Sequence, residues 1–201
     1  MKPTDILSDE HRVIEQVVGC LGKISEQASS EGRLDAQSAR DAMSFFRNFA
    51  DRCHHAKEED HLFPAMEAKG LPREGGPTGV MLAEHRQARE HIRSMDGSIE
   101  AASQGDANAL RKFVQHAQAY SHLLRNHIEK EDHCLFAMAN EAFTAEDQRQ
   151  LLLTFDHVES EEMGAGVHEK YLSIADDLAQ RYGVARASTA HTSHGCGHCH
   201  Q

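Results

Sequence analysis

The sequence predicts an all-α protein: an antiparallel up-down-up-down four-helix bundle with an additional C-terminal helix and a flexible tail rich in His and Cys. The chain has no Trp, three Tyr and four Pro in 201 residues, and such low aromatic content disfavours a β-sheet protein. Apolar residues recur at helical spacing over several long stretches. Short polar or Gly-rich segments separate these stretches, which is typical of antiparallel neighbours in a bundle.

The first two expected helices are each marked by their ends. The first runs from about Thr4 to Ala28, with Thr4 or Asp5 as its N-cap. The second runs from about Asp35 to Lys69. Residues 70–79 contain four Gly and two Pro, which predicts a linker after a helix stop at Gly70.

The third and fourth helices follow the linker. We expect one from about Val80 to Ser103 and the other from about Ala107 to Ala142, with residues 104–106 as the turn. These two helices complete the predicted four-helix bundle, which spans residues 1–142.

A fifth helix is expected to open at Thr144, which precedes acidic residues suited to a first turn. It extends to about Tyr182 and is interrupted around residues 164–166. The predicted organisation is a bundle over residues 1–142, a helical extension packed on it over 143–183, and a flexible tail over 184–201.

Charge and composition exclude several partners. The formal net charge is −11, without a Lys/Arg cluster, so we expect no nucleic acid and no anionic membrane surface as partner. No apolar run is long enough to span a bilayer, and the polar N-terminus lacks the apolar core of a signal peptide. We therefore expect a cytoplasmic protein, in which the scattered Cys20, Cys53 and Cys134 are buried small hydrophobic residues.

Histidine is unusually abundant, and several of the histidines lie in an internal repeat. There are 16 His in the chain. Residues 54–63 align without a gap on residues 127–136, which pairs His54 with His127 and Glu58 with Glu131. His11 precedes His54 by 43 residues, and His85 precedes His127 by 42. The first two helices and the next two therefore look like two copies of one hairpin.

These repeated residues fall on the apolar stripes of their helices. A His and a Glu four residues apart lie on one side of a helix, and burying carboxylates without a partner costs several kcal/mol. A buried metal site is the interpretation we favour, although satisfied core histidines with carboxylates reaching the bundle ends are an alternative. The candidate metal ligands are His11, His54, Glu58, His85, His127 and Glu131.

Neighbouring residues offer further candidates. Asp132 could replace or supplement Glu131, and Glu15 could be an auxiliary ligand. His55 and Glu59 also lie four apart, but they follow a polar stripe and are expected to face solvent. A ferritin-like site needs two Glu-x-x-His motifs, of which the chain has one, so we reject it.

The motifs resemble those of the hemerythrin-like HHE cation-binding proteins of bacteria. The resemblance covers residues 1 to about 180 and rests on DEHRVIE around His11, HHAKEEDHLFP at 54–64, GPTGVMLAEHRQAR at 76–89 and HIEKEDHCLF at 127–136. It implies a four-helix bundle with a non-haem di-iron centre of two Fe ions, bridged by carboxylate and by oxo or hydroxo groups. It implies the same six residues as ligands.

The chain departs from the oxygen-carrying hemerythrins, which have a second His four residues after the ligand of the third helix. Arg89 stands there, and His91 is expected to face elsewhere. Those carriers also have the last carboxylate five residues after its His, where this chain has Asp132. A reversible oxygen-carrier role is therefore not implied, and one imidazole fewer predicts a more open metal position suited to substrate or peroxide chemistry.

Two further groups of metal-binding residue types lie towards the C-terminus. The fifth helix predicts either a second metal site or, as we prefer, a solvated charged face, through Asp156, His157, Glu159, Glu161, Glu162 and His168. The tail residues 191–200 suit Zn, Ni or Cu and predict either a metal-loading arm or adventitious binding.

Three functions are compatible with these features. The first is a di-iron protein that binds oxygen, nitric oxide or peroxide in sensing, buffering or detoxification. The second is a di-iron enzyme that decomposes peroxide or reduces nitric oxide. The third is metal storage or delivery. The same ligands are also compatible with Zn or Mn in place of iron.

Overall fold

The computed structural model describes residues 1–162, 164 and 166–187, and these residues are helical without any β-strand, which confirms the predicted all-α class. The expected flexible tail falls mainly on residues 188–201, outside the described residues. The helices in chain order are α1 (Pro3–Glu31), α2 (Ala36–Phe45), η1 (Phe46–His55), η2 (Lys57–Leu62), α3 (Phe63–Ala68), α4 (Pro77–Asp96), α5 (Ile99–Ser103), α6 (Ala107–Lys130), η3 (Glu131–Leu135), α7 (Phe136–Ala142), α8 (Ala145–His157), η4 (Val158–Glu162) and α9 (Val167–Tyr182).

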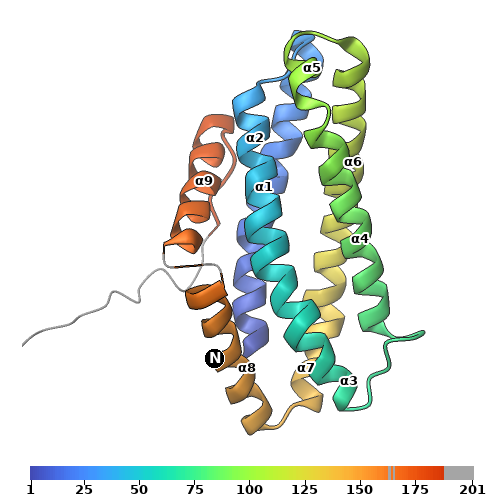
Figure 1. Ribbon diagram of the computed structural model, residues 1–201, viewed down its shortest axis with the longest axis vertical. Helices are drawn as coiled ribbons and strands as arrows, with labels where there is room; N and C mark the ends of the chain where they lie inside the picture. The colour runs from blue at the N-terminus through green and yellow to red at the C-terminus, as the bar shows by residue number, and fades with distance from the viewer. Residues whose placement is uncertain (163, 165, 188–201) are drawn as a thin grey trace, which may run out of the picture.

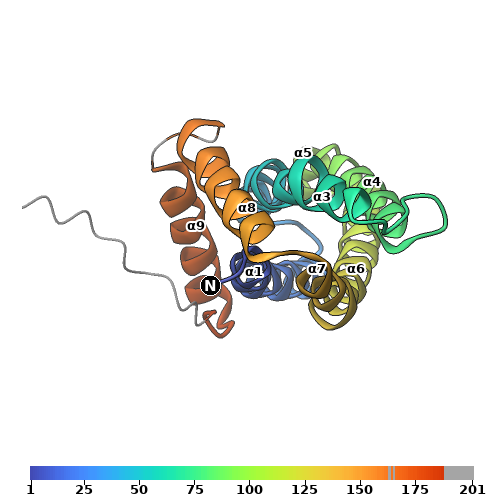
Figure 2. The same cartoon turned by 90° about the horizontal axis from the view of Figure 1, so that it is seen from below.

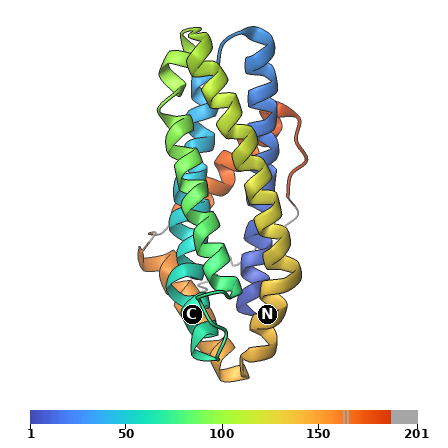
Figure 3. The ribbon, with the colours of Figure 1, turned by 90° about the vertical axis from the view of Figure 1, so that its right-hand side faces the viewer.

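Long helical rods lie side by side in the molecule (Figures 1 and 3). One rod is α1, the next joins α2, η1, η2 and α3, the third is α4, and the last joins α6, η3 and α7. Successive rods run in opposite directions, as the colours of Figure 1 show. The C-terminal helices α8 and α9 contact α1 and the second rod, and Figure 2 shows them on the side away from α4 and α6.

Helix ends follow local chemistry, with some differences from expectation. Lys2 is the N-cap of α1, not Thr4 or Asp5, and α4 begins at Pro77, three residues before the predicted Val80. In both cases a Pro takes the first helical position, where its fixed φ suits the helix and its missing N–H costs no hydrogen bond. Thr144 caps α8 as predicted.

The third predicted helix is interrupted. The helix α4 ends at Asp96, and a separate short helix α5 begins at Ile99. Gly97 and Ser98 lie between them. Glycine costs about 1 kcal/mol relative to alanine inside a helix, so the interruption falls where continued helix is least favourable.

Four stretches of the described chain, η1 to η4, are π-helical, with backbone hydrogen bonds that join residues five apart. The stretches η1 and η2 together contain His54 and Glu58, and η3 begins at Glu131. A π-turn contains one more residue than an α-turn, so side chains along it point in directions that an α-helical wheel does not give. Such turns occur often at functional sites.

The apolar core consists of two clusters with a polar layer between them. One cluster contains Ile14 and Phe46, and the other contains Leu7, Phe63 and Phe136. The histidine-bearing turns of the rods lie between these clusters, so the fold places the repeated His and Glu residues in the interior.

Two other expectations are tested here. No helix among the described residues combines the length and apolar character that crossing a membrane requires. Cys20 and Cys53 are buried as predicted, but Cys134 is exposed, because it lies on the outward side of η3. The expectation of burial was wrong for that residue.

Candidate metal centre

The structure brings the six predicted ligands together in the interior. They come from all four rods, and each is at most 1% exposed. The six are His11 on α1, His54 on η1, Glu58 on η2, His85 on α4, His127 on α6 and Glu131 on η3.

The two carboxylates lie between the imidazoles. One oxygen of Glu131, Oε2, is 3.2 Å from Nε2 of His11 and 3.2 Å from Nε2 of His127. Glu58 has one oxygen 3.5 Å from Nε2 of His54 and the other 3.4 Å from Nε2 of His85. Ligands about 2.1 Å from one ion lie about 3.0 Å apart at right angles and about 3.4 Å apart in a tetrahedron. The observed spacing therefore fits donor atoms around cations.

Two groups of possible ligand atoms share Glu58. One consists of His11, His54, Glu58 and Glu131, and the other of His55, Glu58, His85 and His127, with the donor atoms of each group within 4.8 Å of one another. Because Glu58 belongs to both groups, and one oxygen of Glu131 faces an imidazole of each, the geometry accommodates two neighbouring cations with shared carboxylates.

His55 is the residue that the sequence interpretation missed. It was expected to face solvent, yet it is 3% exposed, and its ring stacks on His85 with centroids 3.7 Å apart. The polar stripe that suggested exposure, with Asp51 and Glu59, packs towards α4, where both carboxylates bind Arg89. The expectation failed because η1 is π-helical, so α-helical spacing does not give its faces.

Each imidazole donates its Nδ1 hydrogen to a carboxylate outside the centre. An ionised carboxylate only accepts, so Nδ1 carries the hydrogen, and in the neutral ring that binds metal Nε2 directs a lone pair inward. Such outer carboxylates fix the tautomer and orientation of metal-binding histidines. The pairs are His11–Asp132 at 2.9 Å, His54–Glu10 at 2.9 Å, His85–Glu59 at 2.6 Å, His127–Glu84 at 2.9 Å and His55–Asp51 at 3.3 Å.

Several inward atoms have no hydrogen-bond partner. Among the described residues, these buried atoms include Nε2 of His11 and both carboxylate oxygens of Glu58 and Glu131. In addition, Nε2 of His85 lies 3.0 Å from Nε2 of His127. Since both rings donate from Nδ1, two lone pairs face each other there. A cation satisfies all of these atoms, so the residues present fit a metal centre.

The outer carboxylates are themselves paired with cations. Asp132 binds Arg12, Glu10 binds Lys57, Glu59 binds Arg89 and Glu84 binds Lys130. These pairs keep the outer carboxylates ionised and therefore able to accept from the imidazoles. The pKa of Glu10 is about 2, because Lys57 and His54 outweigh the effect of burial, which alone would raise it.

The protonation of the metal-free centre also follows from its surroundings. Burial lowers the pKa of His54 to about 4, and burial followed by the neighbouring His55 and His127 lowers that of His85. His11 differs: burial lowers its pKa, but Asp132 and Glu131 raise it to about 9. Burial and Glu131 raise the pKa of Glu58. His54 and His85 therefore stay neutral, as metal binding by imidazole requires, and a bound cation would favour the ionised form of Glu58.

The alternative ligands considered from the sequence have other places. Asp132 lies behind His11 as its hydrogen-bond acceptor, not in place of Glu131. Glu15 has a side chain 37% exposed and pairs with Arg12 at 2.8 Å, so it does not reach the centre. Glu10 and Glu84, which sequence analysis did not single out, each immediately precede a predicted ligand, and that adjacency was the available signal.

The candidate metal-binding residues of the C-terminal helices fall into two groups. Asp156 and His157 are exposed, as a solvated face requires. Glu159 and His168 instead approach Glu10 and Cys53, with donor atoms within 4.8 Å of one another. The side chains of Glu161 and Glu162, and the tail residues 191–200, lie outside the described residues.

Comparisons with known proteins agree with this geometry. A family model described as the Hemerythrin HHE cation binding domain matches residues 2–139. An uncharacterized protein of Mycobacterium bovis is 21% identical over 182 residues, which span 90% of this chain and 70% of that protein. Uncharacterized proteins of two strains of Mycobacterium tuberculosis match to the same extent. No solved structure matches the chain.

Proposed function

Since the chain belongs to the hemerythrin HHE cation-binding family, we propose that its buried cluster holds two iron ions and that this centre binds oxygen, nitric oxide or peroxide. The observation that carries the proposal is the pair of buried donor groups that share Glu58 and contain unpaired inward-facing atoms. Imidazole and carboxylate together suit iron, and also Zn or Mn. Iron would supply reversible oxidation and coordination positions for a small ligand.

The residues would hold the two ions unequally. His55, His85 and His127 surround one position, whereas His11 and His54 serve the other. His55 therefore supplies a fifth imidazole, although the expected helical position on α4 is occupied by Arg89. We propose that the position of His11 and His54, with one imidazole fewer, is the one that accepts the small ligand.

The role of the centre follows from that assignment. Binding without turnover would serve sensing or buffering, and we place it first. An enzyme that decomposes peroxide or reduces nitric oxide is the second candidate, favoured by the lower imidazole count at one position. We retain the hemerythrin topology as part of the proposal: an up-down-up-down bundle over residues 1–142 with residues 143–183 packed on it. The proposed location is the cytoplasm, where buried thiols such as Cys20 and Cys53 stay reduced.

Metal analysis with matched variants tests the proposal. We expect the protein as isolated, or after anaerobic loading with Fe²⁺, to contain two ions per chain, with an absorption spectrum that changes on exposure to oxygen, nitric oxide or peroxide. His54→Ala and His127→Ala should each lose metal. His122→Ala is the control, because His122 is an exposed residue of α6. Full metal content in both site variants would show that the ligand assignment is wrong.

Catalysis has its own readout. Disappearance of peroxide or nitric oxide over many equivalents would favour the enzyme, whereas one reversible spectral change per centre would favour sensing or buffering. Transfer of metal to a chelator that depends on residues 191–200 would favour storage or delivery.

A further inference from the structure

The two hairpins contain the same glutamate–lysine pair in different surroundings. Glu10 and Lys57 flank the centre in the first hairpin, and Glu84 and Lys130 are at the matching positions of the second. The Lys130 side chain is 42% exposed, whereas that of Lys57 is 0% exposed. A fully buried lysine is rare unless it is paired, so we expect Lys57 to have contacts that Lys130 does not have.

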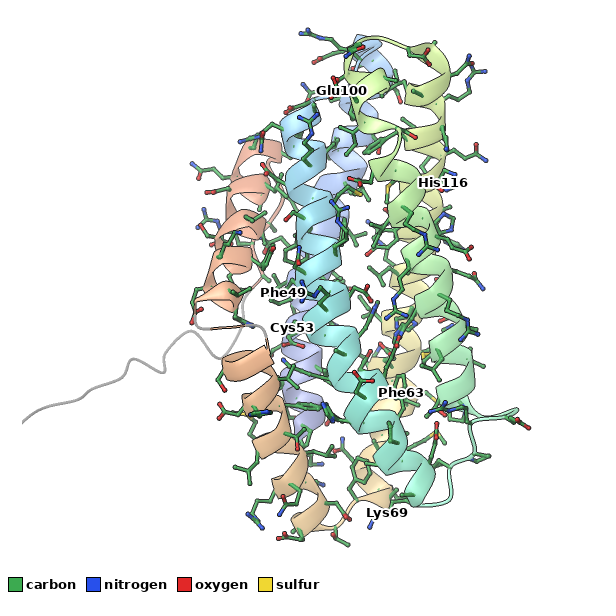
Figure 4. All side chains as sticks on the ribbon, viewed as in Figure 1. Phe49, Cys53, Phe63, Lys69, Glu100 and His116 are labelled. Carbon is green, nitrogen blue, oxygen red and sulfur yellow. The ribbon has the colours of Figure 1, made fainter. Side chains whose placement is uncertain are left out.

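The difference comes from the C-terminal helices. Glu159 of η4 forms an ion pair with Lys57, and the ring of Phe155 on α8 lies 5.8 Å from its ammonium group. His168 of α9 packs near Phe49 of η1, with ring centroids 5.2 Å apart. Figure 4 labels Phe49 and Cys53 on the side of the second rod that faces these helices. The C-terminal helices therefore cover one hairpin and leave the matching surface of the other open.

The polar group at this boundary is not arranged for a metal ion. Glu10, Cys53, Glu159 and His168 offer donor atoms within 4.8 Å of one another, but the Lys57 ammonium binds both carboxylates. Burial raises the pKa of the Cys53 thiol to about 12, so it stays protonated and is a poor ligand. Lys57 is the cation of this group.

The contacts form a continuous series from the molecular surface to the metal centre. Glu159 is 34% exposed and binds Lys57, Lys57 binds Glu10, and Glu10 accepts the Nδ1 hydrogen of His54. Glu10 thereby fixes the ring of His54, whose Nε2 faces Glu58. No corresponding acidic residue reaches Lys130 among the described contacts other than Glu84.

We propose that Glu159 is a positioning residue for one of the two metal positions, acting through Lys57 and Glu10 on His54, so that the C-terminal helices tune that position and not its neighbour. The inference rests on the proposed two-ion centre and specifies how it is regulated. Loss of the Glu159 carboxylate leaves Lys57 with a single anion, which draws the ammonium group and Glu10 together and weakens the hold of Glu10 on His54. Displacement of the C-terminal helices by a partner would have the same effect.

Selective metal release tests the inference. Protein loaded anaerobically with two equivalents of Fe²⁺ is mixed with a coloured Fe²⁺ chelator, and the two phases of release are measured for Glu159→Gln. Direct outer partners of metal-binding histidines change affinity roughly 10–100-fold, so for a residue two contacts removed we expect one phase to become about three- to tenfold faster. The other phase should not change. It belongs to the position that contains His55, and it is recognised as the phase that His55→Ile alters.

Controls separate positioning from general loosening. Glu146→Gln removes the same charge from α8, where Glu146 pairs with the exposed Arg149 at 2.5 Å, and it should leave both phases unchanged. Equal acceleration of both phases by Glu159→Gln would show a merely structural role and overturn the inference, as would release identical to Glu146→Gln. Wild-type protein that binds fewer than two ions would overturn the proposed function itself, so the two failures are distinct.

Discussion

The two hairpins of this protein contain nearly the same set of interactions. Phe136 of the second hairpin stacks on His11 of the first with centroids 5.5 Å apart, and the equivalent Phe63 of the first hairpin stacks on His85 of the second at 6.0 Å. Each hairpin places a carboxylate before the His of its first helix, and that carboxylate accepts from the His of its second helix. The repeat therefore includes the supporting groups as well as the predicted ligands.

Two matching positions make the halves of the centre unequal, one by residue type and the other by exposure. The repeat aligns His55 with Ile128, and both are buried. It aligns Lys57 with Lys130, which are 0% and 42% exposed. A duplicated frame thus supplies a symmetric centre, whereas one substitution and one added pair of helices make its halves unequal. The following variants test how far that inequality goes.

The largest effect is expected from removing the two lysines in turn. Lys57→Met leaves the buried Glu10 without its cation, and breaking a buried pair costs about 3–5 kcal/mol. Lys130→Met removes a cation that is 42% exposed, for which about 0–1 kcal/mol is expected. Urea unfolding of the metal-free proteins measures both. Equal losses of unfolding free energy would mean that the C-terminal helices do not distinguish the hairpins.

The pKa values of the equivalent residues His11 and His85 should be shifted in opposite directions in the metal-free protein. The pKa of His11 is raised from 6.5 to about 9, because Asp132 and Glu131 outweigh burial. Its contribution to stability is therefore complete below pH 6.5 and is lost as pH rises towards 9, by about 3 kcal/mol at 1.36 kcal/mol per pKa unit. Burial and His55 lower the pKa of His85, so its contribution is lost as pH falls below 6.5.

Unfolding midpoints at pH 5, 6.5 and 9 check this prediction. His11→Leu should flatten the alkaline side of the stability profile, and His85→Leu the acidic side. The same side flattened by both variants would contradict the opposite pKa shifts.

A smaller effect is expected when the hairpins are made alike at the other position. His55→Ile copies the residue of the second hairpin and removes one imidazole from the group around His85. We expect metal affinity to fall roughly 10–100-fold at one position, by analogy with the loss of supporting groups at metal sites, and to stay unchanged at the other. Calorimetric titration with Fe²⁺ or Zn²⁺ resolves the two steps. An unchanged titration would exclude His55 as a ligand.

Much of this arrangement could be predicted from the sequence. The apolar stripes place Ile14, Ala88 and Leu124 inward, and each of these residues is buried. The same spacing carries the six predicted ligands inward, because a helix places residues three and four apart on one face. The internal repeat then indicates that the two hairpins face each other across those residues.

The remainder depends on geometry that residue spacing does not encode. We expected His55 to face solvent because α-helical spacing was assumed for this segment, whereas η1 is π-helical. The roles of Glu10 and Glu84 depend on which residue of another rod each one meets, and a charged residue beside a ligand has the same appearance in sequence whether it faces solvent or an imidazole. The pairing of Glu159 with Lys57 likewise depends on where the C-terminal helices lie.

Complete burial of the centre has a consequence for how it is filled. The six predicted ligands and His55 are at most 3% exposed, so a hydrated ion cannot approach them while the rods stay closed. Occupancy is therefore governed by the lifetime of local openings of the helices, and a loaded protein should keep its ions long after the free metal outside has gone. The small uncharged ligands proposed above have no tightly held water to lose, so smaller and briefer openings would admit them, and the closed interior would then exchange its ligand much faster than its metal ions.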